Sequence, residues 1–319
     1  MQELETYFST LFDGRKPETL YAPIAYTMQQ AGKRLRPQMV YHVVEMFGGD
    51  VSQAQYVAAA FEMLHNFTLI HDDIMDKAPI RRGLPTVYQK WNTNSAILSG
   101  DALAIMAFQQ LLKLSVNEKT ILQIANVFAT STLEICEGQQ YDMDFETQEE
   151  VSLEEYINMI RLKTAVMFAG CMKSGAILAG ADQESQEALY QVGINLGIAF
   201  QLADDLLDVY ADSSVFGKSL GGDIRDNKKT YLYLMAIQEA DAEEKPKLKQ
   251  CYESSDLDFE DKFRQVKAYY ERLHIAEKTR QAIHAYLDKS FQELDKVKVN
   301  NEQKATLRKI IADLEQRSK

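Results

Sequence analysis

The chain is poor in the residues that interrupt helices. Its 319 residues include only 6 Pro and 15 Gly, and 46% of the residues are hydrophobic. Such a composition favours long helices around a substantial core. No run of alternating polar and apolar residues is typical of a strand. We therefore expect an all-α protein.

Cysteines, long apolar runs and excess positive charge are also scarce. The three cysteines, Cys136, Cys171 and Cys251, are far apart, so we expect reduced thiols in a cytoplasmic protein. No uncharged apolar run reaches the roughly 18 residues that a membrane span needs, and the acidic start, MQELETYFST, is unlike a signal peptide. A net charge of −12 argues against nucleic acid as a partner.

What the sequence does contain is a dense acidic motif after an apolar stretch. In FTLIHDDIMDKAPIRRG, residues 67–83, three carboxylates lie close together: Asp72, Asp73 and Asp76. On a helix, Asp72 and Asp76 lie about 40° apart on one face. Carboxylates this close repel each other, and a ligand set of oxygens without His or Cys suits Mg²⁺. The alternative is an acidic helix end exposed to solvent.

The motif recurs about 130 residues later. In FQLADDLLDVY, residues 200–210, Asp204, Asp205 and Asp208 have the same spacing, again on an apolar helix. Two copies are harder to explain as solvated surface than one. They are typical of two walls of one metal-lined cavity, so we expect all six aspartates to be catalytic metal ligands.

With these motifs the chain resembles the trans-isoprenyl diphosphate synthases, the polyprenyl synthetase family that includes farnesyl and geranylgeranyl diphosphate synthases. The likeness runs by motif from Gly32 to Thr230 and further by helical pattern. It implies one all-α domain over residues 1–319, a large helical bundle of the isoprenoid synthase type with a central cavity. It also implies a homodimer and about three magnesium ions, with Asp142 as a further metal ligand.

The resemblance assigns residues to two anionic substrates. Isopentenyl diphosphate is expected to bind Lys33 and Arg36 of the motif GKRLRP, with His65 and Arg82. The allylic diphosphate is expected to bind Arg81, Lys163, Thr164, Gln201, Lys218 and Lys228. Lys163 and Thr164 are also expected to act catalytically on the developing cation. Taken alone, GKRLRP is more often a solvated basic loop, and a lone histidine is more often a core residue.

Several local structures are also predicted. The segment GKSLGGDIRDNKKT, residues 217–230, is expected to be a loop that closes over phosphates. The residue before Lys228, often glycine in bacterial relatives, is Asn227, which tolerates left-handed backbone conformations. Helices are expected over residues 51–76, after Gly100, over 117–146, and from a capping box formed by Ser152 and Glu155.

The predicted reaction is ionisation of an allylic diphosphate, head-to-tail attack by isopentenyl diphosphate, and loss of a proton. Product length is assigned by resemblance to Phe67 and Thr68; helix geometry alone does not select Phe67. One aromatic residue there, with no insertion in DDIMD, resembles the geranylgeranyl pattern, so we expect a twenty-carbon product. The alternative is a farnesyl diphosphate synthase.

Two more distant alternatives share features with this chain. A class I terpene cyclase would normally carry an Asn/Ser/Glu metal motif in place of the second aspartate motif. A non-catalytic synthase subunit would typically have lost one of the two aspartate motifs, and both are complete here.

Overall fold

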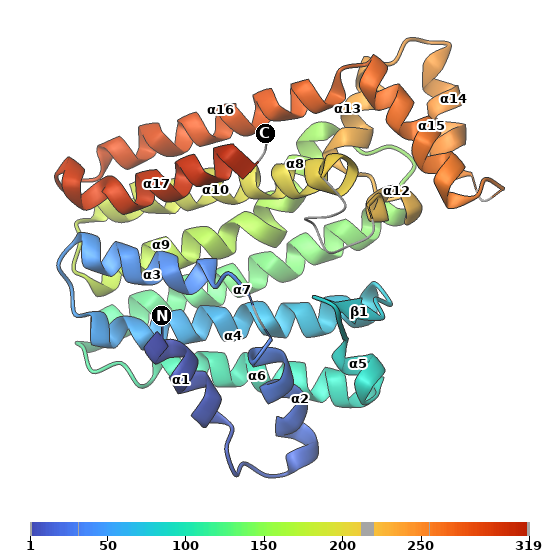
Figure 1. Cartoon of the computed structure of the whole chain (residues 1–319). Coiled ribbons are helices and arrows are strands. Elements are labelled where there is room, and N and C mark those ends of the chain that lie inside the picture. The colour runs from blue at the N-terminus through green and yellow to red at the C-terminus, as the bar shows by residue number, and fades with distance from the viewer. Residues whose placement is uncertain (1, 31, 212–219, 255, 318–319) are drawn as a thin grey trace. The chain divides into compact units, whose positions relative to one another are not determined.

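The structure, a computed structural model, describes residues 2–30, 32–211, 220–254 and 256–317. Helices dominate the described residues, and the one sheet among them is a two-stranded hairpin (Figure 1). The predicted all-α fold is confirmed. The chain divides into two compact units: residues 1–132, 170–189 and 298–304 form unit 1, and residues 133–169, 190–297 and 305–319 form unit 2. A single domain over residues 1–319 stays a prediction.

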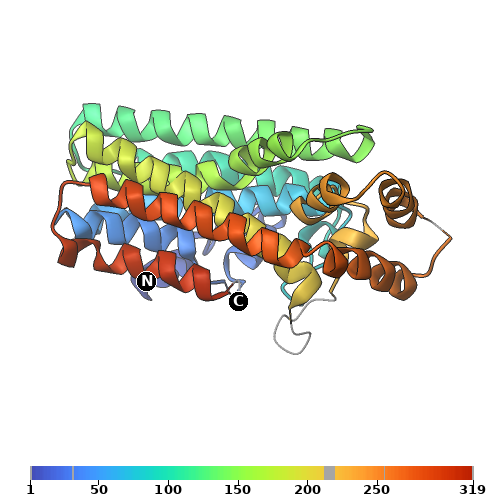
Figure 2. The same ribbon diagram turned by 90° about the horizontal axis from the view of Figure 1, so that it is seen from above.

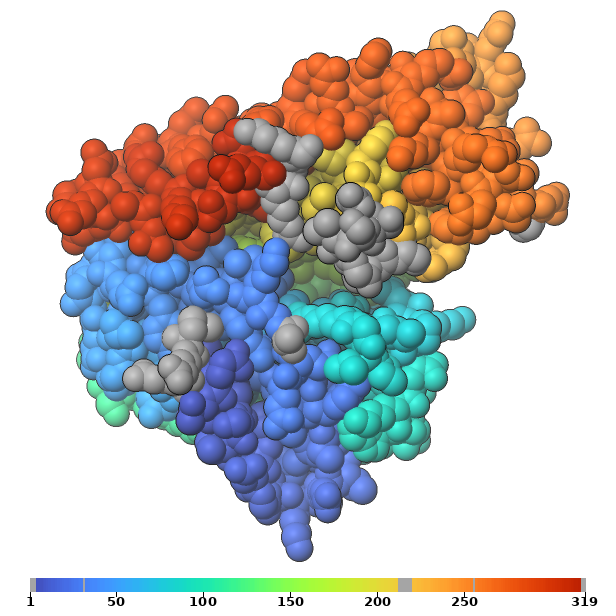
Figure 3. Space-filling view, in the orientation of Figure 1, coloured from blue at the N-terminus to red at the C-terminus, as the bar shows by residue number. Residues whose placement is uncertain are grey.

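Unit 1 is built around α4, which packs along α6 and α3 (Figure 1). Its first two helices, α1 and α2, protrude from the rest of the unit (Figure 3). The described elements of this unit are α1 Gln2–Leu11, α2 Glu18–Met28, α3 Leu35–Met46, α4 Val51–Met75, β1 Ile80–Arg81, β2 Leu84–Pro85, α5 Val87–Lys90, α6 Thr93–Leu111 and the first part of α7 Glu118–Thr147.

Unit 2 contains the second part of α7 and most of α10, with α16 lying along α10 (Figure 2). Its other elements are α8 Leu153–Ile160, the π-helical turn η1 Arg161–Ala165, α12 Gly222–Arg225, α13 Tyr231–Glu239, α14 Glu244–Glu253, α15 Phe259–Arg272 and α16 Ile275–Lys296. Besides α7, three described helices have residues in both units, namely α9 Val166–Leu178, α10 Gln183–Tyr210 and α17 Asn301–Arg317.

Local sequence signals set several helix boundaries. The carboxylate of Asp50 accepts the backbone N–H of Ser52 at 2.9 Å and caps α4, which covers the helix predicted for residues 51–76. The predicted capping box is present at α8, where Ser152 and Glu155 each accept the other's backbone N–H. None of the described helices is long and apolar enough to cross a bilayer.

The prediction of a helix start after Gly100 is wrong, because α6 begins at Thr93 and continues through Gly100. A Cβ on Gly100 would lie 2.3 Å from Nε2 of His71. The glycine is therefore needed for the close approach of α4 and α6 rather than for a helix boundary. The predicted loop over residues 217–230 is also partly wrong, because α12 lies within it.

Candidate functional site

The first aspartate motif lies at the C-terminal end of α4. Asp72 is half-buried and the C-cap residue Asp76 is exposed, whereas Asp73 is only 4% exposed. Nε of Arg81 donates a 2.7 Å hydrogen bond to Oδ1 of Asp73. A buried carboxylate is costly unless a cation pairs with it, so Arg81 explains how Asp73 is accommodated.

The β1–β2 hairpin presents the two arginines that follow this motif. Its two-residue turn holds Arg82 and Gly83 at φ values of 52° and 76°, as a type I′ turn requires. An arginine in the left-handed region is strained by about 1–3 kcal/mol, a cost that is most often found at functional sites. A Cβ on Gly32 would lie 3.1 Å from Nη1 of Arg82. The turn therefore brings Arg82 beside the GKRLRP motif.

Within GKRLRP, the three basic side chains have different environments. Arg34 is buried, and its guanidinium donates to Oε1 of Glu62 at 2.6 Å and to Oε1 of Glu5 at 2.8 Å. By contrast, Lys33 is exposed and Arg36 is half-buried. Arg34 therefore anchors the motif within unit 1, while Lys33 and Arg36 are the residues predicted to bind phosphate.

His65, on α4, lies among these cations. Burial, followed by the positive charges of Arg36, Arg82, Arg81 and Arg34, holds the pKa of His65 well below its usual range. The imidazole is therefore neutral at pH 7 and can donate a hydrogen bond without adding charge. Four guanidinium groups near one imidazole create a local positive potential in an acidic chain, and this potential suits a diphosphate.

The two predicted chain-length residues point in different directions from α4. The Phe67 ring lies edge-on against His71, with centroids 4.8 Å apart, and Nε2 of His71 lies 3.2 Å from the carbonyl oxygen of Ile97 on α6. The hydroxyl of Thr68 donates to the carbonyl oxygen of His65 at 2.8 Å. Phe67 therefore lies on the α6 side of the helix, and the role of both residues stays a prediction.

The second aspartate motif lies near the C-terminal end of α10, and its middle residue is again buried. Asp205 is 4% exposed. It accepts hydrogen bonds from the hydroxyl of Tyr156, from Nε2 of Gln201 at 3.0 Å and from the backbone N–H of Tyr231 at 3.4 Å. Burial raises the pKa of Asp205 to about 6, although the three hydrogen bonds act in the opposite direction.

The last residue of this motif, Asp208, holds the segment that precedes α13. Its Oδ1 accepts the backbone N–H of Gly222 at 3.2 Å, and its Oδ2 accepts that of Asp223 at 3.1 Å. Burial, followed by the negative charges of Asp208 and Asp205, raises the pKa of Asp223 to about 8. Asp223 is therefore a fourth carboxylate of this cluster, beside the half-buried Asp204.

The π-helical turn η1 carries Lys163 and Thr164. Nζ of Lys163 donates to Oδ2 of Asp142 on α7 at 2.5 Å, and the hydroxyl of Thr164 donates to Oε1 of Gln201 on α10 at 3.1 Å. A Cβ on Gly138 would lie 2.3 Å from the backbone nitrogen of Lys163, so only glycine lets α7 approach this turn. Single π-helical turns within helices are frequent at functional sites.

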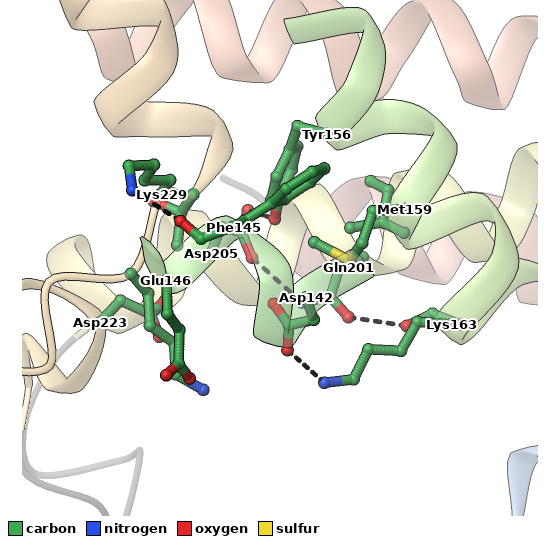
Figure 4. A pocket seen from close by; sticks show the side chains of 14 residues that line it. Asp142, Phe145, Glu146, Tyr156, Met159, Lys163, Gln201, Asp205, Asp223 and Lys229 are labelled. Carbon is green, nitrogen blue, oxygen red and sulfur yellow. Dashed lines mark hydrogen bonds and ion pairs between the residues drawn. The ribbon is translucent and has the colours of Figure 1, made fainter. Parts of the chain in front are cut away.

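These side chains line one pocket of unit 2 (Figure 4), which encloses about 110 Å³, enough for several water-sized groups. It combines acidic residues with three lysines, Lys163, Lys228 and Lys229, and Nζ of Lys229 donates to the carbonyl oxygen of Phe145 at 2.6 Å. The predicted Lys218 lies outside the described residues. The lining residues are Asp142, Phe145, Glu146, Tyr156, Met159, Ile160, Lys163, Thr164, Gln201, Asp205, Asp223, Lys228, Lys229 and Thr230.

The donors of both aspartate motifs are oxygens, which fit magnesium better than a softer metal. Among the residues that the structure describes, no three His, Cys, Asp or Glu side chains are arranged to hold a metal ion by themselves. Magnesium is usually bound by one or two carboxylates together with substrate phosphates. A divalent cation beside Asp205 and Asp223 would offset the repulsion that helps to raise the pKa of Asp223.

The structure thus brings many of the predicted residues together within each unit. In unit 1 it groups Arg36, His65, Arg81 and Arg82, and in unit 2 it groups Asp142, Lys163, Thr164, Gln201, Asp205 and Lys228. The functional roles of these residues stay predictions. The sequence analysis missed Asp223 and Tyr156. Asp223 could have been found from its position after two glycines in a segment already predicted to close over phosphates. Nothing in the sequence around Tyr156 indicates more than a helix.

The chain is similar to known proteins in sequence and in fold. Residues 17–270 match the family described as polyprenyl synthetase. The geranylgeranyl diphosphate synthase of Methanosarcina mazei is 43% identical over 223 residues, which cover 70% of this chain and 69% of that protein. A crystal structure of a geranylgeranyl pyrophosphate synthase is similar with a TM-score of 0.93 and 41% identity, covering 99% of this chain and 98% of the other. For the polyprenyl synthase of Caulobacter crescentus CB15, solved with calcium and isoprenyl diphosphate, the TM-score is 0.87 at 28% identity, over 100% of this chain and 94% of the other. The chain belongs to the polyprenyl synthetase family, whose members are prenyltransferases with the all-α isoprenoid synthase fold.

Proposed function

We propose that this protein condenses isopentenyl diphosphate head-to-tail with an allylic diphosphate and forms geranylgeranyl diphosphate. The observation that carries this proposal is that each aspartate motif has its own group of cations. In unit 1 the motif is followed by Arg81 and Arg82, which lie near His65. In unit 2 the middle aspartate of the motif, Asp205, lines a pocket together with Lys163 and Lys228. Two such groups suit two diphosphate substrates.

Isopentenyl diphosphate is assigned to the cations of unit 1. Lys33, Arg36 and Arg82 supply positive charge, and the neutral imidazole of His65 supplies a further hydrogen bond. Guanidinium groups grip phosphate oxygens in pairs, which fixes the orientation of the substrate as well as its position. This group therefore holds the double bond of isopentenyl diphosphate in one place.

The allylic diphosphate is assigned to Lys163, Thr164, Gln201 and Lys228 of unit 2 and to the undescribed Lys218. Lys163 is paired with Asp142 at 2.5 Å, and Thr164 with Gln201 at 3.1 Å. These contacts orient both side chains of the π-helical turn before substrate arrives. Such preorganisation favours charge that develops on the departing diphosphate.

Magnesium is assigned to the six aspartates of the two motifs, whose oxygens suit this ion. Asp142, which is paired with Lys163, is a further candidate. When bound, magnesium would neutralise the diphosphate as a leaving group. About three ions are expected by resemblance to the family.

The reaction has three steps. The allylic C1–O bond breaks, the double bond of isopentenyl diphosphate attacks the resulting cation at C1, and a proton is then lost from the adduct. The residues of the chain bind both diphosphates, orient them and keep water away from the cation. We assign the proton to the departing diphosphate, because no protein base is obvious in the sequence.

The length of the product is assigned to Phe67 and Thr68. They lie on α4 about 6–7.5 Å before Asp72 along the helix axis, at about 1.5 Å per residue. A prenyl chain that grows from the aspartates along α4 would meet the Phe67 ring after a limited number of five-carbon additions. A twenty-carbon product follows from this assignment, and a fifteen-carbon product is the alternative.

A homodimer is supported by the surface of α6. Leu98, Ile105 and Leu112 are 60%, 65% and 63% exposed, and their seven-residue spacing places them along one side of the helix. Exposed apolar side chains at this spacing fit a second copy of the chain. We expect the wild type to sediment as a dimer and Ile105→Glu to sediment as a monomer; a monomeric wild type would refute this assignment.

A cytoplasmic location is supported by the cysteines. No disulfide joins any of the three cysteines of the described chain, and Cys171 and Cys251 are buried. Reduced thiols are typical of cytoplasmic proteins.

Incubation of the pure protein with Mg²⁺, isopentenyl diphosphate and a five-, ten- or fifteen-carbon allylic diphosphate tests the proposed reaction. Mass spectrometry should show a twenty-carbon diphosphate from each primer and none when EDTA replaces Mg²⁺. A cyclic hydrocarbon would instead identify a class I terpene cyclase. No product from any primer would identify a non-catalytic subunit.

A further inference from the structure

A lysine outside the predicted site is buried without an acidic partner. Lys262, on α15, is 4% exposed, and burial lowers the pKa of its ammonium group. No carboxylate of the described residues forms an ion pair with it. Its Nζ instead donates a hydrogen bond to Oδ1 of Asn227 and lies 5.7 Å from the centroid of the Tyr252 ring. The negative charge of Asp226 acts in favour of this ammonium group, but a buried ammonium whose hydrogen bond goes to a neutral amide is still costly, so its position calls for an explanation.

The acceptor of that hydrogen bond ends α12 in a Schellman motif. The backbone N–H of Asn227 bonds to the carbonyl oxygen of Ile224 at 3.4 Å, and that of Lys228 bonds to the carbonyl oxygen of Asp223 at 2.9 Å. Asn227 occupies the left-handed position of the motif, with a φ of 56°. Glycine is the most common residue there, and it satisfies the backbone equally well. The asparagine therefore adds one thing that glycine lacks, an acceptor for Lys262.

The same hydrogen-bonded cluster also fixes the next residue. The hydroxyl of Tyr252 donates to the carbonyl oxygen of Lys228 at 2.6 Å, and its ring stacks on Tyr233 with centroids 4.0 Å apart. Tyr252 lies in the last turn of α14 and Lys262 in the first turn of α15, and these two helices pack together (Figure 1). The hydroxyl of Tyr252 also lies 3.4 Å from the carbonyl oxygen of Asp223, so the two helices together contact Asp223, Asn227 and Lys228.

The segment held in this way is a wall of the pocket in unit 2. Asp223, Lys228 and Thr230 all line that pocket. At its other end the segment is fixed by Asp208, which accepts the backbone N–H groups of Gly222 and Asp223. Asp208 and the α14–α15 pair therefore hold opposite ends of the segment 222–228.

We propose that Lys262 and Asn227 are positioning residues that hold Lys228 and Asp223 in place for the allylic diphosphate. This inference rests on the proposed function. Neither residue touches the pocket itself, because the pocket is lined by their neighbours. With glycine at position 227, backbone geometry alone would hold this segment in place. The hydrogen bond from Lys262 to Asn227 adds a side-chain contact that does so.

Three variants separate this role from general stability. Asn227→Gly keeps the left-handed backbone without strain and removes only the acceptor, at an exposed position. Lys262→Met removes the ammonium and keeps most of the side-chain length beside Tyr252. Asn227→Asp keeps the acceptor. Lys247→Met, at an exposed lysine of α14, is the matched control for loss of a lysine.

The first readout is the KM for each substrate. We expect Asn227→Gly and Lys262→Met to raise the KM for the allylic diphosphate about tenfold each, with the KM for isopentenyl diphosphate within about twofold of wild type. The double variant should be no worse than either single one, because both remove the same bond. Asn227→Asp and Lys247→Met should match wild type. Unchanged allylic KM values, equal rises in both KM values, or multiplying effects in the double variant would overturn the proposal.

The second readout does not depend on catalysis. Amide hydrogen exchange across residues 222–230 should be faster in Asn227→Gly and in Lys262→Met than in wild type or Lys247→Met, in the absence of substrate. If wild type turns over no allylic diphosphate, the proposed function fails, yet exchange still tests whether this bond holds the segment. Unchanged exchange in both variants would overturn the positioning role whatever the activity.

Discussion

Replacing Gly138 by alanine should lower turnover by about a hundredfold. The new Cβ would lie 2.3 Å from the backbone nitrogen of Lys163 and 2.7 Å from its Cα. Since ordinary contacts of this kind are 3.4 Å or longer, α7 and the π-helical turn must separate by about 1 Å. A displacement of that size in a catalytic group can cost about 10²-fold, and overpacking should destabilise the fold by about 1–3 kcal/mol.

The matched control is Gly193→Ala, in which a Cβ on α10 would lie 2.4 Å from Cα of Ala169. This clash is equally severe and lies in the same unit, but away from the Lys163 side chain. Both variants should lose similar stability by thermal melting, while only Gly138→Ala should lose turnover per folded molecule. Equal turnover in the two variants would refute the argument that Gly138 positions the π-helical turn.

Five other changes test the rest of the site. Asp204→Asn should lower turnover by orders of magnitude with unchanged helicity; near-normal turnover would contradict a metal ligand there. Lys33→Ala should raise mainly the KM for isopentenyl diphosphate, and Lys163→Ala should raise mainly the KM for the allylic substrate. Each rise should be about ten- to a hundredfold, as expected for loss of a charged hydrogen bond worth about 1.5–3 kcal/mol. Equal effects on both substrates would contradict the assignment of the two lysines to different substrates. Phe67→Ala should lengthen the products seen by mass spectrometry, and an unchanged distribution would exclude Phe67 as the stop. Burial raises the folded-state pKa of Asp223 to about 8, so the native state keeps a proton that the unfolded state loses near pH 4. The free energy of unfolding of the wild type should therefore fall as pH rises from about 4 to about 8. Asp223→Asn should melt at a higher temperature than wild type at pH 8 without Mg²⁺, and a lower melting temperature would contradict the raised pKa.

Most of the fold could be predicted because its signals are local. The capping box at Ser152 and the apolar helix over residues 51–76 depend on neighbours in the sequence, and both are present. The helix start predicted after Gly100 was wrong because this glycine serves a tertiary contact. It makes room for His71 of another helix. The left-handed conformation of Arg82 could not be predicted, since arginine seldom adopts a positive φ and no short-range pattern indicates it.

The site could be predicted in its residue types but not in its contacts. The aspartate motifs and GKRLRP are visible in the sequence because their spacing is regular. The partners of these residues come from distant segments, as with Tyr156 and Asp205 or Lys262 and Asn227. A buried tyrosine or lysine in a helix has the same sequence signature as any other core residue, so its role becomes visible only with its neighbours.

The two aspartate motifs share a feature that their spacing alone does not explain. In each, the middle residue is 4% exposed, and it is bound by Arg81 in one motif and by Tyr156 in the other. On a helix, adjacent residues point about 100° apart, so the first and middle aspartates of one motif do not face the same way, while the first and last do. The repeated Asp-Asp pair is therefore best explained as two functions side by side. The middle aspartate ties the end of the helix to the element that carries the neighbouring cations or pocket wall, and the first points away from these contacts, as the predicted metal ligand should.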